Sequence, residues 1–126
     1  MTIESEFPMT ILNAIASLAV SDLPAATTWY AHLLGKQAAS QPMPEVAEWK
    51  FDRGGWLQLY QQADRAGGGS VTLAVDDIEA LASHLQQVGV AHGALSSTPQ
   101  VRTIMLTDPD GNHIAFAQAL DTSMAR

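Results

Sequence analysis

Hydrophobic and polar residues alternate over residues 12–20, with the two-residue period of a strand that buries one face. From residue 23 the apolar spacing changes to that of an amphipathic helix. Asp22 can cap the first turn of this helix and Gly35 can end it, so the pattern predicts a helix over residues 23–34. Three short strands are expected to follow, at about 36–41, 46–52 and 55–61.

The second half of the chain shows the same succession. A strand is predicted over residues 70–75, followed by a helix over residues 78–88 that Asp76 or Asp77 caps. Gly89 ends this helix. Further strands are expected near 91–95, 101–107 and 112–119, and the sequence D-P-D-G-N between the last two is typical of a type I turn.

An internal repeat relates the two halves. The pattern L-A-V-x-D-[LI]-x-A occurs at residues 18–25 and again at residues 73–80. We therefore expect an α+β fold of two βαβββ modules that form a cupped mixed sheet. The chain is interpreted as a single domain, 1–126, with a first module at about 11–62, a glycine-rich linker at about 65–69 and a second module at about 70–119. Because each helix covers only one sheet face, the other faces can enclose a small molecule.

Charge and composition narrow the possible partners. Lys and Arg number 6 and Asp and Glu number 13, which gives a net charge of −7. Without a basic cluster, binding to nucleic acid or to an anionic membrane is not expected. The absence of cysteine excludes disulfides and thiolate metal sites. No signal-peptide or membrane-spanning pattern is present, so we expect a cytoplasmic protein.

Three motifs together resemble the vicinal oxygen chelate superfamily of glyoxalases, bleomycin-resistance proteins and extradiol dioxygenases. They are the V-x-D-[LI] sequence that opens each helix, the pair Trp29-Tyr30 in the first helix, and D-P-D-G-N at residues 108–112. The resemblance extends over about residues 11–119. It implies a metal-dependent enzyme or a metal-free binding protein, since the superfamily contains both.

The resemblance also implies where a metal would be bound. In the metal enzymes, His and Glu ligands occupy four positions, which correspond here to Ile15, Gln58, Ser70 and Ala115. Only Gln58 offers a donor, and an amide is a weak ligand for divalent metals. We therefore expect neither a metal site nor a cofactor.

Strand alternation predicts which side chains line the cup. The candidate ligand-binding residues are Trp56, Gln58, Tyr60, Ser70, Thr72, Thr103, Met105 and His113. The resulting wall is aromatic, small and neutral. His113 is also a candidate acid–base residue, because imidazole transfers protons near neutral pH.

Neighbouring positions are assigned by the same alternation. Glu48 and Lys50 are expected toward the mouth of the cup, and Trp49 and Phe51 behind the sheet against a helix. Arg102 is interpreted either as a partner for a substrate anion at the rim or as a solvated residue at a strand edge.

These observations favour a metal-independent protein that binds an apolar or aromatic small molecule. Two alternatives remain open. One is an enzyme of the superfamily (lyase, isomerase or dioxygenase) with a non-standard metal site or with His113 as acid–base. The other is a dimeric structural or interaction module with a filled cup. We also expect a homodimer, because an apolar sheet face needs cover. Each cup is expected to take strands from both βαβββ units. The two modules could pair within one chain or be exchanged between two chains, and the sequence leaves both arrangements open.

Overall fold

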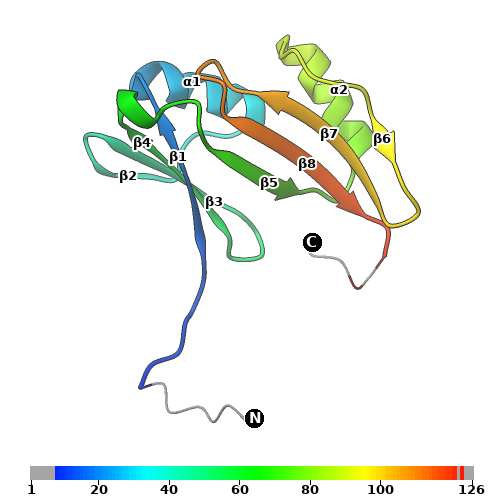
Figure 1. Cartoon of the computed structure of the whole chain (residues 1–126), viewed down its shortest axis with the longest axis horizontal. Coiled ribbons are helices and arrows are strands. Elements are labelled where there is room, and N and C mark those ends of the chain that lie inside the picture. The colour runs from blue at the N-terminus through cyan, green and yellow to red at the C-terminus, as the bar shows by residue number, and fades with distance from the viewer. Residues whose placement is uncertain (1–7, 122, 124–126) are drawn as a thin grey trace.

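The structure is a computed structural model that describes residues 8–121 and 123, and these residues form two four-stranded sheets and two α-helices (Figure 1). The first half contains β1 (Ile15–Val20), α1 (Leu23–Leu34), β2 (Ser40–Met43), β3 (Val46–Lys50) and β4 (Trp56–Gln61). A short 3₁₀ helix, η1 (Ala63–Arg65), leads to the second half. There the elements are β5 (Ser70–Ala74), α2 (Ile78–Val88), β6 (Ser96–Ser97), β7 (Val101–Thr107) and β8 (His113–Ala119). The predicted α+β fold with two βαβββ units is confirmed. Within the described residues, no helix is long and apolar enough to cross a membrane.

The two sheets have the same topology. Their strand orders are β1-β4-β3-β2 and β5-β8-β7-β6, with a parallel first pair and antiparallel pairs after it. The register agrees as well: Ser17 pairs with Gln58, and Thr72 at the equivalent position pairs with Ala115. The repeat seen in the sequence is therefore a repeat of strand pairing.

Both helices begin and end where the sequence predicts. The carboxylate of Asp22 accepts a hydrogen bond from the amide of Ala25 at 3.1 Å, and Asp77 accepts one from Ala80 at 3.0 Å. Each bond satisfies an amide that the first helical turn leaves free. Left-handed glycines end both helices, with φ of 70° at Gly35 and 73° at Gly89.

The short edge strands differ from the prediction. The strand expected over 91–95 is absent, and β6 contains only Ser96 and Ser97. Gly93 instead donates one backbone hydrogen bond to Met105 O at 2.8 Å, because Ala, His and Gly in this segment have little tendency to form a ladder. Likewise, β2 begins at Ser40 rather than near residue 36, and its pairing with β3 is irregular.

The hydrophobic core lies between the helices and one face of each sheet (Figure 1). Trp49 is fully buried, and its ring lies 6.1 Å from that of Tyr30 on α1, centroid to centroid. Phe51 is partly buried against the same cluster. The prediction that Trp49 and Phe51 lie behind the sheet is confirmed.

The D-P-D-G-N turn between β7 and β8 joins the second module to the first through a buried carboxylate. Asp108 is only 4% exposed, and its Oδ2 accepts the Tyr30 hydroxyl at 2.7 Å and the Asn112 side-chain amide at 2.8 Å. Its Oδ1 accepts the backbone amides of Asp110 and Asn112 at 3.0 and 2.9 Å. All four donors are neutral, so their number offsets the cost of removing the carboxylate from water.

The same turn also contacts β1 and the linker. Asn112 donates to Ala19 O at 2.8 Å and accepts from Gly69 N at 2.9 Å. Asp110 accepts two hydrogen bonds from Ser21, at 3.0 Å from the amide and 2.6 Å from the hydroxyl. The turn thus fixes the second sheet to the end of the first strand.

A second contact between the modules joins the helices. Nε2 of His84 on α2 lies 2.8 Å from His32 O and 3.1 Å from Leu33 O in the last turn of α1. These carbonyls lack partners within their own helix. Their hydrogen bonds to His84 therefore hold the two helices next to one another.

We predict that Tyr30→Phe lowers the free energy of unfolding by about 1–3 kcal/mol, because it removes one donor from a buried carboxylate. Urea unfolding measures the change. Tyr60→Phe is the matched control, since the Tyr60 hydroxyl has no hydrogen bond to the described part of the chain, and it should change stability little. Equal losses in both variants would contradict the role assigned to Tyr30.

This effect has a defined pH dependence. Burial, and then the neighbouring Asp108 carboxylate, raise the pKa of Tyr30 above its ordinary value. In the unfolded chain tyrosine ionises at about pH 10, so the stabilisation is complete below that pH. Above it, the stability difference between the wild type and Tyr30→Phe should shrink by about 1.4 kcal/mol per pH unit. A difference that does not change between pH 8 and 11 would contradict this.

Adjacent linker glycines provide a second matched pair. Gly67 has φ of +90°, and an added Cβ would lie 2.2 Å from Asp110 O, whereas a Cβ on Gly68 would lie 3.7 Å from Arg65 O, its nearest atom. Gly67→Ala should therefore cost at least about 2 kcal/mol, and Gly68→Ala should stay within about 0.5 kcal/mol of the wild type. Thermal unfolding of the two variants checks this. Similar Tm values would show that the close contact between Gly67 and the turn at Asp110 does not limit stability.

Candidate functional site

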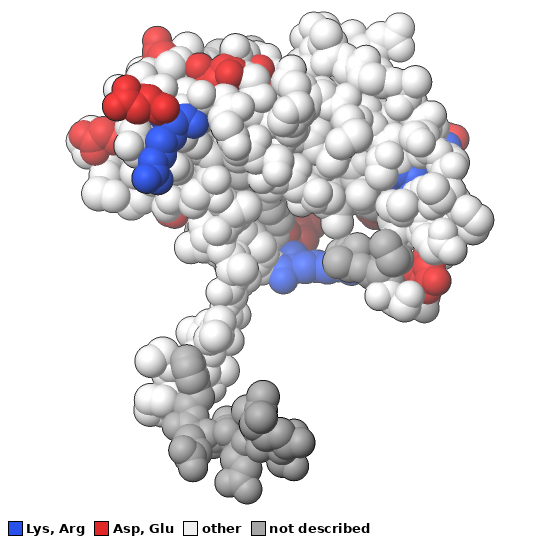
Figure 2. Space-filling view, viewed as in Figure 1, with Lys and Arg blue, Asp and Glu red and all other residues white. Residues whose placement is uncertain are grey.

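The sheet faces opposite the helices are open. Large apolar side chains on or beside them are exposed, including Ile15 at 53%, Met43 at 55% and Met105 at 60%. Figure 2 shows that most of the visible surface carries neither Lys or Arg nor Asp or Glu, and that the charged residues lie in small groups around its edge. An apolar surface of this kind is suited to bind another apolar group.

A row of hydrogen-bonded polar side chains crosses the open face of the first sheet. Ser17 on β1 donates to Gln58 Oε1 on β4 at 3.1 Å, and Gln58 Nε2 donates to Glu48 Oε2 on β3 at 3.0 Å. Ser40 on β2 completes the row with a 3.2 Å bond to Glu48 Oε1. Each side chain comes from the next strand in the sheet, so the strand register produces the row. Glu48, which was expected toward the mouth of the cup, thus lies on the open face with Gln58.

Two aromatic side chains flank this row. Trp56 and Tyr60 lie two residues before and after Gln58 on β4, and both are half-buried. The ammonium of Lys50 lies 5.8 Å from the centroid of the Trp56 ring. The face therefore combines flat apolar area with a fixed line of hydrogen-bonding groups, an arrangement that can orient a small molecule as well as hold it.

The second sheet has a smaller and more neutral open face. Neighbouring strands form rows, with Thr72, Ala115 and Met105 in one row and Ser70 and His113 in the next. His113 is exposed, and its ring has no hydrogen bond to the described residues that would orient it for proton transfer. Most side chains on this face are small, and polar groups of Ser, Thr and His alternate with apolar ones, so the face has no row of linked side chains like that of the first sheet.

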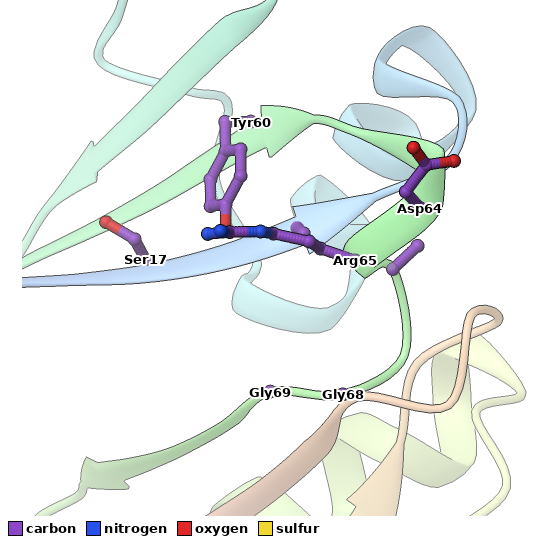
Figure 3. A pocket seen from close by; sticks show the side chains of 8 residues that line it. Ser17, Tyr60, Asp64, Arg65, Gly68 and Gly69 are labelled. Atoms are coloured by element: carbon purple, nitrogen blue, oxygen red, sulfur yellow. The ribbon is translucent and has the colours of Figure 1, made fainter.

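A hollow of about 480 Å³ lies where the first sheet meets the linker (Figure 3). Tyr60 and Ser17 on the open face form one side of it, and η1 and the linker form the other. Its lining consists of Ser17, Ala19, Tyr60, Asp64, Arg65, Ala66, Gly68 and Gly69. The hollow is thus continuous with the aromatic part of the open face.

The structure separates the predicted site residues into two sets. Trp56, Gln58 and Tyr60 lie together on β4. The second set lies on the other sheet and consists of Ser70, Thr72, Thr103, Met105 and His113. Tyr60 alone among all of these lines the hollow. Within one chain, therefore, the two sets belong to neighbouring open faces.

Two lining residues were not found from the sequence. Asp64 and Arg65 belong to η1, where the end of the first module meets the predicted glycine-rich linker at about 65–69 and no regular element is predicted. No local pattern distinguishes a linker arginine that faces solvent from one that faces a hollow. Arg102, by contrast, forms an ion pair of 3.0 Å with Glu79 on α2, which places it on the helix side of its sheet.

The four positions at which a metal would be expected do not fit one. Ile15 and Ala115 carry no donor atom, Ser70 is a weak ligand, and the amide of Gln58 already bonds to Ser17 and Glu48. Across the described residues, no group of three or more His, Asp or Glu side chains could hold a metal ion. The donor set of this chain therefore does not support the metal chemistry of the superfamily.

Comparisons with known proteins agree with this architecture. The model of the glyoxalase-like domain matches residues 15–117. A glyoxalase/bleomycin resistance protein from Catenulispora acidiphila is 34% identical, covers 86% of this chain and 98% of its own, and superposes with a TM-score of 0.78. A comparison with curated proteins gives no significant match.

Two further solved structures are similar. TnmS3, an antibiotic binding protein from a Streptomyces species, is 26% identical, with coverage of 90% and 99% and a TM-score of 0.76. A bleomycin-binding protein from Streptomyces verticillus shares the fold at 21% identity, with coverage of 86% and 96% and a TM-score of 0.70. Because the family model spans both modules, the chain belongs to the glyoxalase-like domain family, within the vicinal oxygen chelate superfamily.

Proposed function

We propose that this protein binds an apolar or aromatic small molecule without a metal ion. The observation that carries the proposal is the open face of the first sheet, where Trp56 and Tyr60 flank a hydrogen-bonded row centred on Gln58. This face offers a ligand flat apolar area and a fixed direction. Among the described residues, this face offers no set of side chains that could hold a metal ion.

The energetics favour an aromatic ligand. An aromatic side chain has about 150–250 Å² of surface to bury, and apolar burial contributes about 25 cal/mol per Å². Covering Trp56 and the exposed part of Tyr60 therefore provides several kcal/mol before the cost of association. The polar row limits the ligand further, since its own polar group must align with Gln58 or Glu48 to avoid leaving them desolvated and unpaired.

The similar proteins support binding in the same way. A protein 26% identical to this chain is described as an antibiotic binding protein. This chain shares its fold over nearly the whole length of both chains. A role in the cytoplasm, as a carrier or a sequestering protein for an organic compound, agrees with the aromatic site and the absence of cysteine.

We propose further that the functional unit is a homodimer. Binding sites usually enclose about 70–90% of a small ligand, and an open sheet face cannot do so alone. A second copy would cover the exposed face and bring the set on β4 opposite the set on β5, β7 and β8. Each cup would then contain strands from both βαβββ units.

Ligand binding should quench tryptophan fluorescence through Trp56. We predict that aromatic compounds found by thermal-shift screening quench the wild type and Trp29→Phe, but that Trp56→Phe loses the quenching and binds at least about ten-fold more weakly. Trp29 on α1 is the matched control because it packs against Tyr30, on the helix side.

The same titration in the presence of EDTA tests metal independence. Unchanged affinity is expected. A stoichiometric, tightly bound transition metal in the purified protein, or loss of binding with EDTA, would contradict the proposal, as would quenching that persists in Trp56→Phe.

Light scattering at micromolar concentration should give twice the chain mass of 13.4 kDa. A chain carrying Ser17→Cys and Ser70→Cys, treated with a short bifunctional thiol reagent, should form a crosslink across the cup. Interchain products would show that modules are exchanged, and intrachain products that they pair within one chain. A monomeric mass would contradict the dimer, and absence of any crosslink would contradict a cup built from both units.

A further inference from the structure

Arg65 differs from every other described lysine and arginine. Its guanidinium makes no hydrogen bond, ion pair or ring contact with the described residues, although the chain has 13 acidic side chains and only 6 basic ones. The others are all engaged: Arg102 with Glu79, Lys36 with Lys50 O, Lys50 with Trp56, and Arg53 with a further group. In so acidic a chain, a guanidinium without an internal carboxylate is available for an external anion.

The Arg65 guanidinium extends into the hollow toward the open face of the first sheet. Figure 3 shows the Arg65 side chain extending from η1 toward Tyr60 and Ser17, while the Asp64 carboxylate points away from it. The linker closes the opposite side of the hollow, where Asn112 holds Gly69 by a 2.9 Å hydrogen bond. The contact between the modules therefore sets the side of the hollow that faces Arg65.

The donors at the hollow suit a carboxylate. A guanidinium presents parallel N–H groups that match the two oxygens of a carboxylate. The Tyr60 hydroxyl, which has no hydrogen bond to the described residues, can donate as well. Ser17 contributes less, because its hydroxyl hydrogen is directed to Gln58.

We propose that the hollow is the anion subsite of the ligand site and that Arg65 and Tyr60 bind a carboxylate carried by the aromatic ligand. The inference rests on the proposed function and specifies its substrate class. Tyr60 is shared by the hollow and the aromatic face, so a flat ring placed along β4 between Trp56 and Tyr60 directs its substituent toward Arg65.

The test compares 2-naphthoate with 2-naphthamide, which have nearly the same shape and differ in charge. Isothermal titration at pH 7 should give at least ten-fold tighter binding of the naphthoate to the wild-type protein. Arg65→Gln should abolish this preference without weakening the amide, and Arg65→Lys should retain part of it because the charge remains but the fork is lost. Tyr60→Phe should reduce the preference by a smaller factor.

Arg102→Gln is the matched control, since it removes the same charge on the helix side of the other sheet. Arg102→Gln should leave the preference for naphthoate intact. If it lost the preference as fully as Arg65→Gln does, the net charge of the protein would explain the preference, and the inference would be overturned. Equal binding of both probes to the wild type would overturn the anion subsite while leaving the proposed function in place. Failure of both probes, together with an empty thermal-shift screen, would overturn both. Circular dichroism of each variant checks that it is folded. Arg65 is exposed, so its substitution should leave the core intact.

Discussion

The buried carboxylate of Asp108 constrains the whole structure. A carboxylate that is 4% exposed and has no cationic partner among the described residues is tolerated only if hydrogen-bond donors surround it. Three of its four donors come from its own turn, and the fourth is the Tyr30 hydroxyl on the helix of the other module. Any displacement of one module relative to the other would leave the carboxylate short of a donor. The arrangement of the sheets is therefore specified by chemistry as well as by apolar packing.

The candidate site depends on this contact. Asn112, which donates to Asp108, also holds Gly69, and the linker between Arg65 and Gly69 forms one side of the hollow. The close approach of Gly67 to Asp110 O leaves no space for a side chain there. A turn of the second module thus holds the linker that forms one side of the hollow. The contact between the modules and one side of the hollow therefore both depend on Asn112.

The parts of this molecule that sequence predicts are those fixed by local chemistry. Asp22 and Asp77 are capping residues, Gly35 and Gly89 adopt left-handed conformations, and both helices have the predicted bounds. Alternation correctly placed Trp49 behind the sheet and Glu48 in front of it. Residues 91–95 were wrongly predicted as a strand, because Ala, His and Gly in this segment form only one backbone hydrogen bond to β7 and no ladder. Sequence also gave no sign that Asp108 bonds to Tyr30 or that Arg65 faces a hollow, since both depend on how the two modules meet.

The equivalent turns of the two modules show how one backbone supports different roles. In the first module Phe51 N donates to Gly55 O at 2.8 Å, and in the second Asp108 N donates to Asn112 O at 2.9 Å. Gly54 and Gly111 have nearly the same φ, 96° and 98°. The backbone is repeated, but the side chains differ: the second turn has the Asp and Asn that bind the first module, and the first turn has Phe51, which packs against the core.

The two modules also share a backbone but differ in side chains near the strand positions where the superfamily's metal enzymes have their ligands. The pairing of Ser17 with Gln58 recurs as that of Thr72 with Ala115, so both modules keep the geometry of the site. In the first module the side chains extend it into a polar row that runs through Glu48 to Ser40, and in the second they leave a wall of mostly small side chains with no such row. With no set of metal donors at these positions, the repeated scaffold presents two unlike surfaces, one that can orient a ligand and one that can cover it.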